Sequence, residues 1–148
     1  MRFFLTIAFL LLSLPAMAAV TVTQPLTFGE FALTDNSAPR SMSISALGVL
    51  SKDTQFVTII PPQEAIVDVS GFPTKTNLII NITFNNLTSV DGGDSFTIST
   101  PNIRPNNPKT DNAGEITLRI GATLTTSGGG GFYPDSTYNG LMTVSVNY

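Results

Sequence analysis

Residues 138–148 read YNGLMTVSVNY, an alternation of apolar and polar side chains that continues to the last residue. A period of two residues places alternate side chains on opposite faces of a β-strand. One face would carry Tyr138, Met142, Val144, Val146 and Tyr148, and the other Thr143, Ser145 and Asn147. The stretch therefore predicts a half-buried strand that pairs with a neighbour and closes a β-sandwich.

The rest of the chain repeats this pattern in short runs separated by turn residues. The clearest inner strand is Asn77–Phe84, which is apolar at every second position. Further strands are predicted at Ser41–Leu47, Gln55–Ile60, Ala65–Val69, Ser95–Thr100, Glu115–Thr126 and Thr137–Tyr148. No segment has a helical period, so we predict an all-β, immunoglobulin-like antiparallel sandwich, either complete in itself or completed by a donated strand.

Gly and Pro mark the irregular parts of the predicted sandwich. The apolar positions change parity after Gly29, which predicts a bulge there. The Pro- and Asn-rich stretch 101–112 is predicted to be a loop, and Gly128–Gly131 a flexible hairpin loop. Phe132 and Tyr133 follow that loop and could form an exposed aromatic contact for a sugar or a neighbouring subunit, or fold back onto the core.

The N-terminus has the features of a secretory signal peptide, residues 1–18. Arg2 precedes an apolar run at positions 3–14, and Pro15 and the small residues around Met17 follow. Cleavage after Ala18 would leave residues 19–148, a length suited to a single domain. Because the apolar run is shorter than the roughly 20 residues that cross a bilayer, we predict an exported protein that does not span the membrane.

Composition excludes several classes of function. The chain has no Cys, His or Trp, so disulfides, Ser-His-Asp and Cys-His catalysis, and the usual zinc ligands are all unavailable. The formal net charge is −3 without a basic patch, which argues against nucleic acid as a partner. We therefore predict a protein that is not an enzyme and has no cofactor.

Two pairs of carboxylates remain as candidate sites, Asp91 with Asp94 and Asp111 with Glu115. Both pairs lie among Gly and Asn residues, and solvated turns explain them, because Asp and Gly are typical turn residues. Asp91 and Asp94 could also supply oxygen ligands to calcium, but their spacing does not match a calcium-binding loop. The prediction is that no metal is bound.

Three segments resemble a family of bacterial secreted domains of unknown function: Leu26-Thr27-Phe28-Gly29, Gly121-Ala122-Thr123-Leu124 and the ending Tyr138–Tyr148. That family is similar in turn to spore coat protein U and to the subunits of archaic chaperone-usher pili. The resemblance implies an immunoglobulin-like sandwich that reaches the periplasm, and then the surface or exterior, of a Gram-negative bacterium. It also implies a structural or minor subunit of a pilus-like filament, with related subunits, a chaperone and an usher as partners, and no catalytic residues.

Strand donation would give specific residues a role in assembly. A sandwich that lacks a strand exposes an apolar groove and unpaired backbone groups, and a strand from a partner fills both. The candidate assembly residues are Val20, Val22, Met142, Val144, Val146 and Tyr148. Ala19–Gln24 could be a donor strand or the first strand of the domain itself. A self-complete adhesin or carbohydrate-binding module, acting through its loops, is the alternative.

Overall fold

The computed structural model describes residues 17–148, so nearly all of the predicted signal peptide lies outside the described residues. This range contains twelve β-strands and no helix, and therefore no helix that is long and apolar enough to cross a membrane. The strands are β1 (Ala19–Gln24), β2 (Glu30–Leu33), β3 (Ser41–Ile44), β4 (Leu50–Lys52), β5 (Phe56–Ile60), β6 (Ala65–Ser70), β7 (Ile79–Phe84), β8 (Thr88–Ser89), β9 (Thr97–Arg104), β10 (Ile116–Thr125), β11 (Tyr138–Asn139) and β12 (Met142–Asn147).

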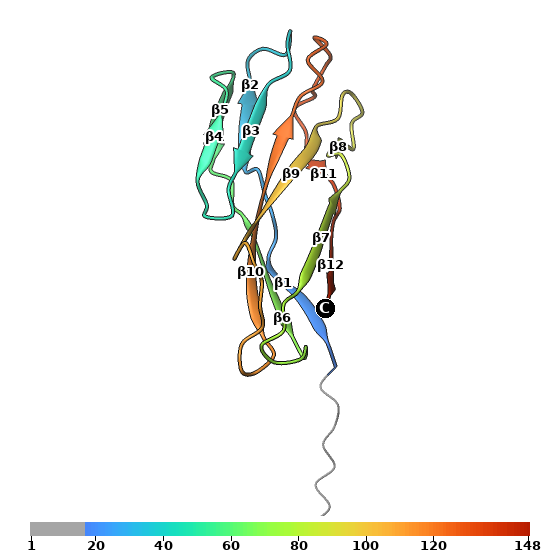
Figure 1. Cartoon of the computed structure of the whole chain (residues 1–148). Helices are drawn as coiled ribbons and strands as arrows, with labels where there is room; N and C mark the ends of the chain where they lie inside the picture. Colours follow the sequence, from blue (N-terminus) through green and yellow to red (C-terminus); the bar gives the residue numbers. More distant parts are fainter. Residues whose placement is uncertain (1–16) are drawn as a thin grey trace, which may run out of the picture.

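One layer of the fold is a six-stranded sheet built around β10. Residues 116–120 of β10 pair with β6, and residues 122–125 pair with β3 on the same edge. β9 pairs along the opposite edge, while β1 extends the sheet beyond β6 and β4 extends it beyond β3. β10 consequently runs through most of the elongated molecule (Figure 1).

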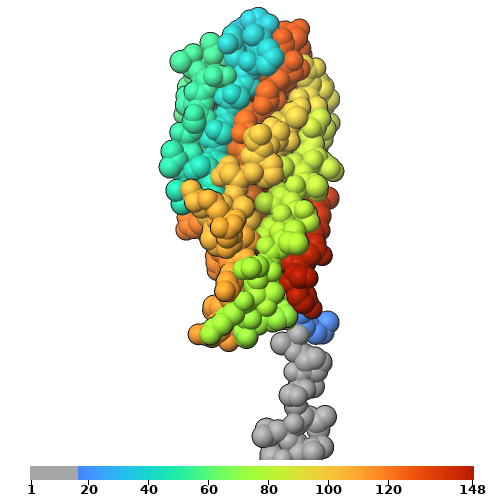
Figure 2. All heavy atoms as spheres, viewed as in Figure 1, coloured from blue at the N-terminus to red at the C-terminus, as the bar shows by residue number. Residues whose placement is uncertain are grey.

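The second layer consists of three antiparallel strand pairs: β7 with β12, β8 with β11, and β2 with β5. The first two pairs follow one another along the same two segments, and the Asn85 amide, which donates to the Leu141 carbonyl (2.9 Å), links them. Figure 2 shows β7 and β9 side by side on the visible face, with β12 at its edge. The all-β antiparallel sandwich predicted from the sequence is confirmed.

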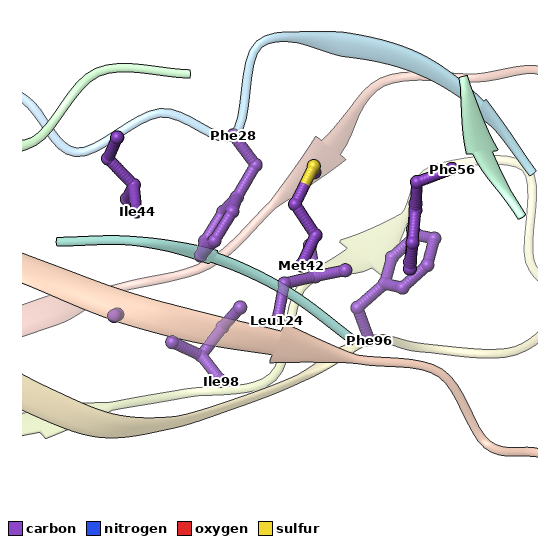
Figure 3. Close-up of a cluster of buried hydrophobic side chains, with 8 residues drawn as sticks. Phe28, Met42, Ile44, Phe56, Phe96, Ile98 and Leu124 are labelled. Carbon is purple, nitrogen blue, oxygen red and sulfur yellow. The ribbon is translucent and has the colours of Figure 1, made fainter. Parts of the chain in front are cut away.

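Alternate residues of β10 supply both halves of the core. Leu118 and Ile120 belong to a lower cluster, and Ala122 and Leu124 belong to an upper one. The lower cluster also contains Ala65, Val67, Val69 and Leu78. The upper cluster, drawn in Figure 3, also contains Phe28, Met42, Ile44, Phe56, Phe96 and Ile98. Leu26 packs against both clusters and thereby joins them.

The face predicted for the C-terminal strand is confirmed except at its end. Met142, Val144 and Val146 pack against the lower cluster, whereas the residues between them are exposed. Tyr148 was predicted to lie on the same inner face but is 72% exposed. Asn147 is the last residue that pairs with β7, so Tyr148 extends past the sheet, where its ring packs at a right angle to the Phe72 ring (centroids 5.7 Å apart).

The predicted loop at 101–112 is wrong at its beginning, because β9 continues to Arg104. Pairing with β10 holds this segment extended, although Pro101 cannot donate a hydrogen bond to the sheet. Pro101 is tolerated because it lies in a bulge, where the register shifts opposite 121–123 and Thr100 has φ of 45°. The short strands β4 and β8 were not predicted either.

The predicted irregularity at Gly29 is confirmed. Gly29 has φ of 72°, and the pairing of β2 with β5 changes register immediately after it. A Cβ atom at this position would lie 2.1 Å from the Ile60 carbonyl oxygen, so only glycine allows the two backbones to come this close. The glycine of the Leu26–Gly29 segment thus has a structural role.

We expect Val146→Asp to lower the free energy of unfolding by about 2–3 kcal/mol, because it places a carboxylate without a cationic partner against the lower cluster. A urea melt of the purified domain measures this change. Asn147→Ser, on the exposed face of the same strand, is the control and should change stability by less than about 0.5 kcal/mol. Equal melts for the two variants would show that this face of β12 is not buried.

Candidate functional site

A groove with a volume of about 1380 Å³ opens between two parts of the second layer. One wall runs from Leu26 through β2 to Ser37, and the other runs from Gly130 through β11 to Met142. We call it the β2–β11 groove. Both flanking strands lie in the upper half of the molecule in Figure 1.

Apolar side chains of the upper cluster line this groove. They are Phe28, Phe31, Phe84, Leu87, Phe96, Ile98, Leu124 and Tyr138. Phe31 packs edge-on against Phe56 (centroids 5.1 Å apart) and against Phe96 (5.6 Å), an arrangement that aromatic rings favour. Phe31, Phe84, Leu87 and Tyr138 are only partly buried, so they are the apolar surface that an occupant of the groove could contact, and polar residues line the groove beside them.

The strands on either side of the groove have unpaired edges. Within residues 17–148, β2 pairs only with β5, β11 only with β8, and β12 only with β7. Each pairing uses one edge of the strand, so backbone N–H and C=O groups on the other edge are free to pair with an added strand. Apolar lining and free edges together are what an extended peptide requires of a binding site.

The charges along the groove are all negative. Its lining contains the carboxylates of Glu30, Asp35 and Asp135 but no Lys or Arg. The negative charge of Asp35 is compensated by an ion pair with Arg40. This ion pair, together with hydrogen bonds from Ser37, lowers the pKa of the Asp35 carboxyl. Glu30 and Asp135 are exposed and form no ion pair with another described residue. An acidic occupant would therefore be repelled.

Asn36 connects the two walls at the upper end of the groove. Its side-chain amide donates to Ser127 Oγ (3.2 Å) and to the Gly131 carbonyl (3.3 Å), and its Oδ1 accepts from the Gly128 amide (3.1 Å). Its own carbonyl accepts from the Gly130 amide (2.8 Å). The glycine run was predicted to be a flexible loop, but these bonds tie it to the loop after β2.

The two aromatic residues after the glycine run have different environments. Tyr133 folds back, stacks on Phe96 (centroids 4.3 Å apart) and accepts a hydrogen bond from the Ser127 amide (2.7 Å). Phe132 is 72% exposed. Of the predicted aromatic contact, only Phe132 is therefore available to a ligand or a neighbouring subunit.

Tyr138 lies in the groove wall with its hydroxyl donating to the Pro134 carbonyl (3.1 Å). Burial raises its pKa above the ordinary value of 10, and the charges of Tyr133, Asp94 and Asp91 add to the effect. The Tyr138 hydroxyl thus stays a neutral donor at physiological pH.

The paired carboxylates are parts of turns. The Asp91 carboxylate accepts a hydrogen bond from the Ser136 hydroxyl, and the Asp94 carboxylate accepts one from the Ser127 hydroxyl (2.6 Å). Each carboxylate is thus hydrogen-bonded to a neighbouring loop. Asp111 Oδ1 accepts from the amides of Ala113 (2.8 Å) and Glu115 (3.0 Å). No group of three potential metal ligands forms within residues 17–148.

We expect stability to depend on pH through Asp111. The hydrogen bonds from Glu115 and Ala113 lower the pKa of this carboxyl below its ordinary value of 3.8. A lowered pKa means that the stabilisation is present above that value and is lost as the pH falls below it. Urea midpoints of the wild type and Asp111→Asn should therefore differ at pH 7 and converge as the pH falls below 3.8 and through the lowered pKa of Asp111. A constant difference across this range would contradict the assignment.

The structure brings only one of the predicted assembly residues to the groove. Met142 lines it, whereas Val144 and Val146 pack against the lower cluster. Ala19–Gln24 is the first strand of the domain itself, β1, and pairs with β6. Its Val20 and Val22 side chains are 40% and 50% exposed, away from the groove.

Sequence patterns did not identify most of the groove residues. Phe31, Leu87 and Phe96 come from three segments that are far apart in the chain. In the sequence, each of them is only an apolar residue beside a strand boundary. Core residues have the same pattern, so the sequence does not distinguish the two. The change of parity at Gly29 did mark a position within the wall that contains β2.

The family model described as Domain of unknown function (DUF4402) matches residues 19–148. The chain belongs to this family. The DUF4402 domain contains all twelve strands and begins at Ala19, the residue at which the predicted mature chain begins. No curated protein and no solved structure matches the chain.

Proposed function

We propose that this DUF4402 protein is a structural or minor subunit of a bacterial surface filament that is assembled by strand donation, and that the β2–β11 groove accepts the strand. The observation that carries the proposal is the groove itself. Partly buried apolar side chains line it, and the strands on both sides have free edges.

An extended strand in this groove would satisfy two needs of the domain at once. Its backbone would pair with β2 on one side and β11 on the other, and its alternate side chains would cover the partly buried Phe31 and Leu87. Covering these apolar side chains is favourable in water. A contact between unlike surfaces that does not close a ring builds a filament.

The resemblance to pilin subunits supports the same proposal and adds its cellular setting. Export through the predicted signal peptide would deliver the chain to the periplasm of a Gram-negative bacterium. A chaperone strand would occupy the groove there, and an outer-membrane usher would exchange it for the strand of another subunit. Such a chain has no need of a catalytic residue or a cofactor.

Two charged substitutions test the proposal in the bacterium that produces the protein. Leu87→Arg puts a cation into the groove lining, whereas Val90→Arg changes a nearby side chain that is 81% exposed. We expect SDS-resistant, heat-labile ladders of surface protein from the wild type and Val90→Arg, and none from Leu87→Arg. Urea melts of the purified domains verify that each variant folds.

Ladders that persist in Leu87→Arg would contradict strand donation into this groove. A wild type that forms no ladders, remains a stable monomer and binds a glycan would instead support the alternative, a self-complete adhesin or carbohydrate-binding module. Exposed Phe132 would then be the first residue to substitute.

A further inference from the structure

The two strands beside the β2–β11 groove each have an apolar face and an exposed face. On β2, Phe31 is half-buried and packs against the upper cluster, whereas Glu30 before it is exposed. On β11, Tyr138 is half-buried against the same cluster, whereas Asn139 after it is exposed. A strand added between them would therefore have every second side chain on the apolar side and the others on the exposed side.

Negative charge lies on the exposed side of both walls. Glu30 begins β2, and Asp135 lies in the loop before β11. Asp91 lies beside that loop, since its carboxylate accepts a hydrogen bond from the hydroxyl of Ser136 in the groove lining. All three carboxylates are exposed, and none forms an ion pair with another residue of the described range. No Lys or Arg of residues 17–148 lines the groove.

From this arrangement we propose that the strand donated by the neighbouring subunit alternates apolar side chains with basic ones. This inference rests on the proposed function and adds the chemistry of the donated strand. The apolar side chains contact Phe31 and Tyr138, and the Lys or Arg side chains between them lie beside Glu30 and Asp135.

Charge then selects among donor strands that are equally apolar. Opposite charges on neighbouring strands attract and like charges repel, so a basic strand is favoured at these walls and an acidic strand is disfavoured. The two apolar faces would match in either case. The exposed carboxylates of Glu30 and Asp135 therefore determine which subunit occupies the groove, rather than whether a strand can occupy it.

Peptide binding tests the proposed preference. The protein is purified from the bacterium that produces it, unfolded in guanidinium chloride and refolded with a fluorescein-labelled peptide. Each peptide has Val at every second position and Lys, Thr or Asp between. We expect one Val/Lys peptide per chain, bound about threefold or more tighter than the Val/Thr peptide in low salt, and the Val/Asp peptide to bind least. These differences should decrease as salt is added, because the wall carboxylates are exposed.

A matched pair of double variants locates the charge effect. Glu30→Gln with Asp135→Asn removes two charges from the groove lining, and Asp68→Asn with Glu115→Gln removes two exposed charges outside it. We expect the first pair to abolish the preference for Lys over Thr and the second to retain it. If both double variants retained or lost the preference equally, it would reflect the net charge of the protein, and the proposal would be wrong.

A further peptide with the β1 sequence AVTVTQ represents donation of this strand by a second copy of the chain. It has no basic side chain, so we expect it to bind no more tightly than the Val/Thr peptide. Binding as tight as that of the Val/Lys peptide would identify a second copy as the occupant and overturn the basic strand.

Charge reversal in the bacterium gives a measurement that does not depend on refolding. Glu30→Lys with Asp135→Lys should weaken the SDS-resistant ladders, whereas Asp68→Lys with Glu115→Lys should leave them unchanged, and urea melts verify that both variants fold. Ladders that persist in the groove variant but are abolished by Leu87→Arg would overturn the basic strand and leave the proposed function standing. A wild type that forms no ladders and binds none of the peptides would overturn both.

Discussion

Gly121→Ala is expected to lower the free energy of unfolding by about 3 kcal/mol or more. A Cβ atom at Gly121 would lie 2.2 Å from the Ile44 carbonyl oxygen and 2.6 Å from the Ala46 amide nitrogen. These atoms belong to the backbone at the end of β3, and they cannot move away without disrupting its pairing with β10. The midpoint of a urea melt, or loss of soluble protein, measures the effect.

The position of Gly121 explains the close approach. It is the residue of β10 between the part that pairs with β6 and the part that pairs with β3. Gly129→Ala is the control, since nothing lies within 4 Å of a Cβ atom there, and it should change stability by less than about 0.5 kcal/mol. A Gly121→Ala domain as stable as this control would mean that the two strands do not meet as described.

Phe56→Ala should lower the free energy of unfolding by about 3–5 kcal/mol, because the whole ring is buried and its removal leaves a cavity. The ring also supports Phe31 edge-on, and Phe31 lines the groove. We therefore expect weaker SDS-resistant ladders in the bacterium in addition to a lower urea midpoint.

The control for Phe56→Ala is Val57→Ala, the next residue of β5, whose side chain is exposed. It should leave both the urea midpoint and the ladders nearly unchanged. If Phe56→Ala lowered the midpoint but left the ladders intact, Phe31 would not depend on this ring for its position, and the description of the groove floor would be wrong.

The sequence was a good guide wherever the decisive interaction is local. Alternation in Asn77–Phe84 and in β12 correctly predicted which side chains face the core, because successive side chains of a strand point to opposite faces regardless of the partner. Gly29 predicted the irregularity before β2 for a similar reason, since its backbone conformation is a property of a single residue.

The sequence was a poor guide wherever a strand depends on its neighbour. The extension of β9 to Arg104 comes from pairing with β10, against the tendency of Pro101. The attachment of the glycine run comes from Asn36, which is about ninety residues away in the chain. Tyr148 continues the alternation but has no partner strand beside it, so its ring stays in solvent.

The sequence by itself determined that this is a Cys-free, all-β domain whose apolar side chains lie on one face of each strand, because side-chain alternation and composition need no knowledge of distant contacts. Only the tertiary structure decided that β1 completes its own sheet and that β2 and β11 each have a free edge beside an apolar floor. The physical reason is that hydrogen bonds between strands can be made with many partners, and the selection among partners depends on how the whole core packs.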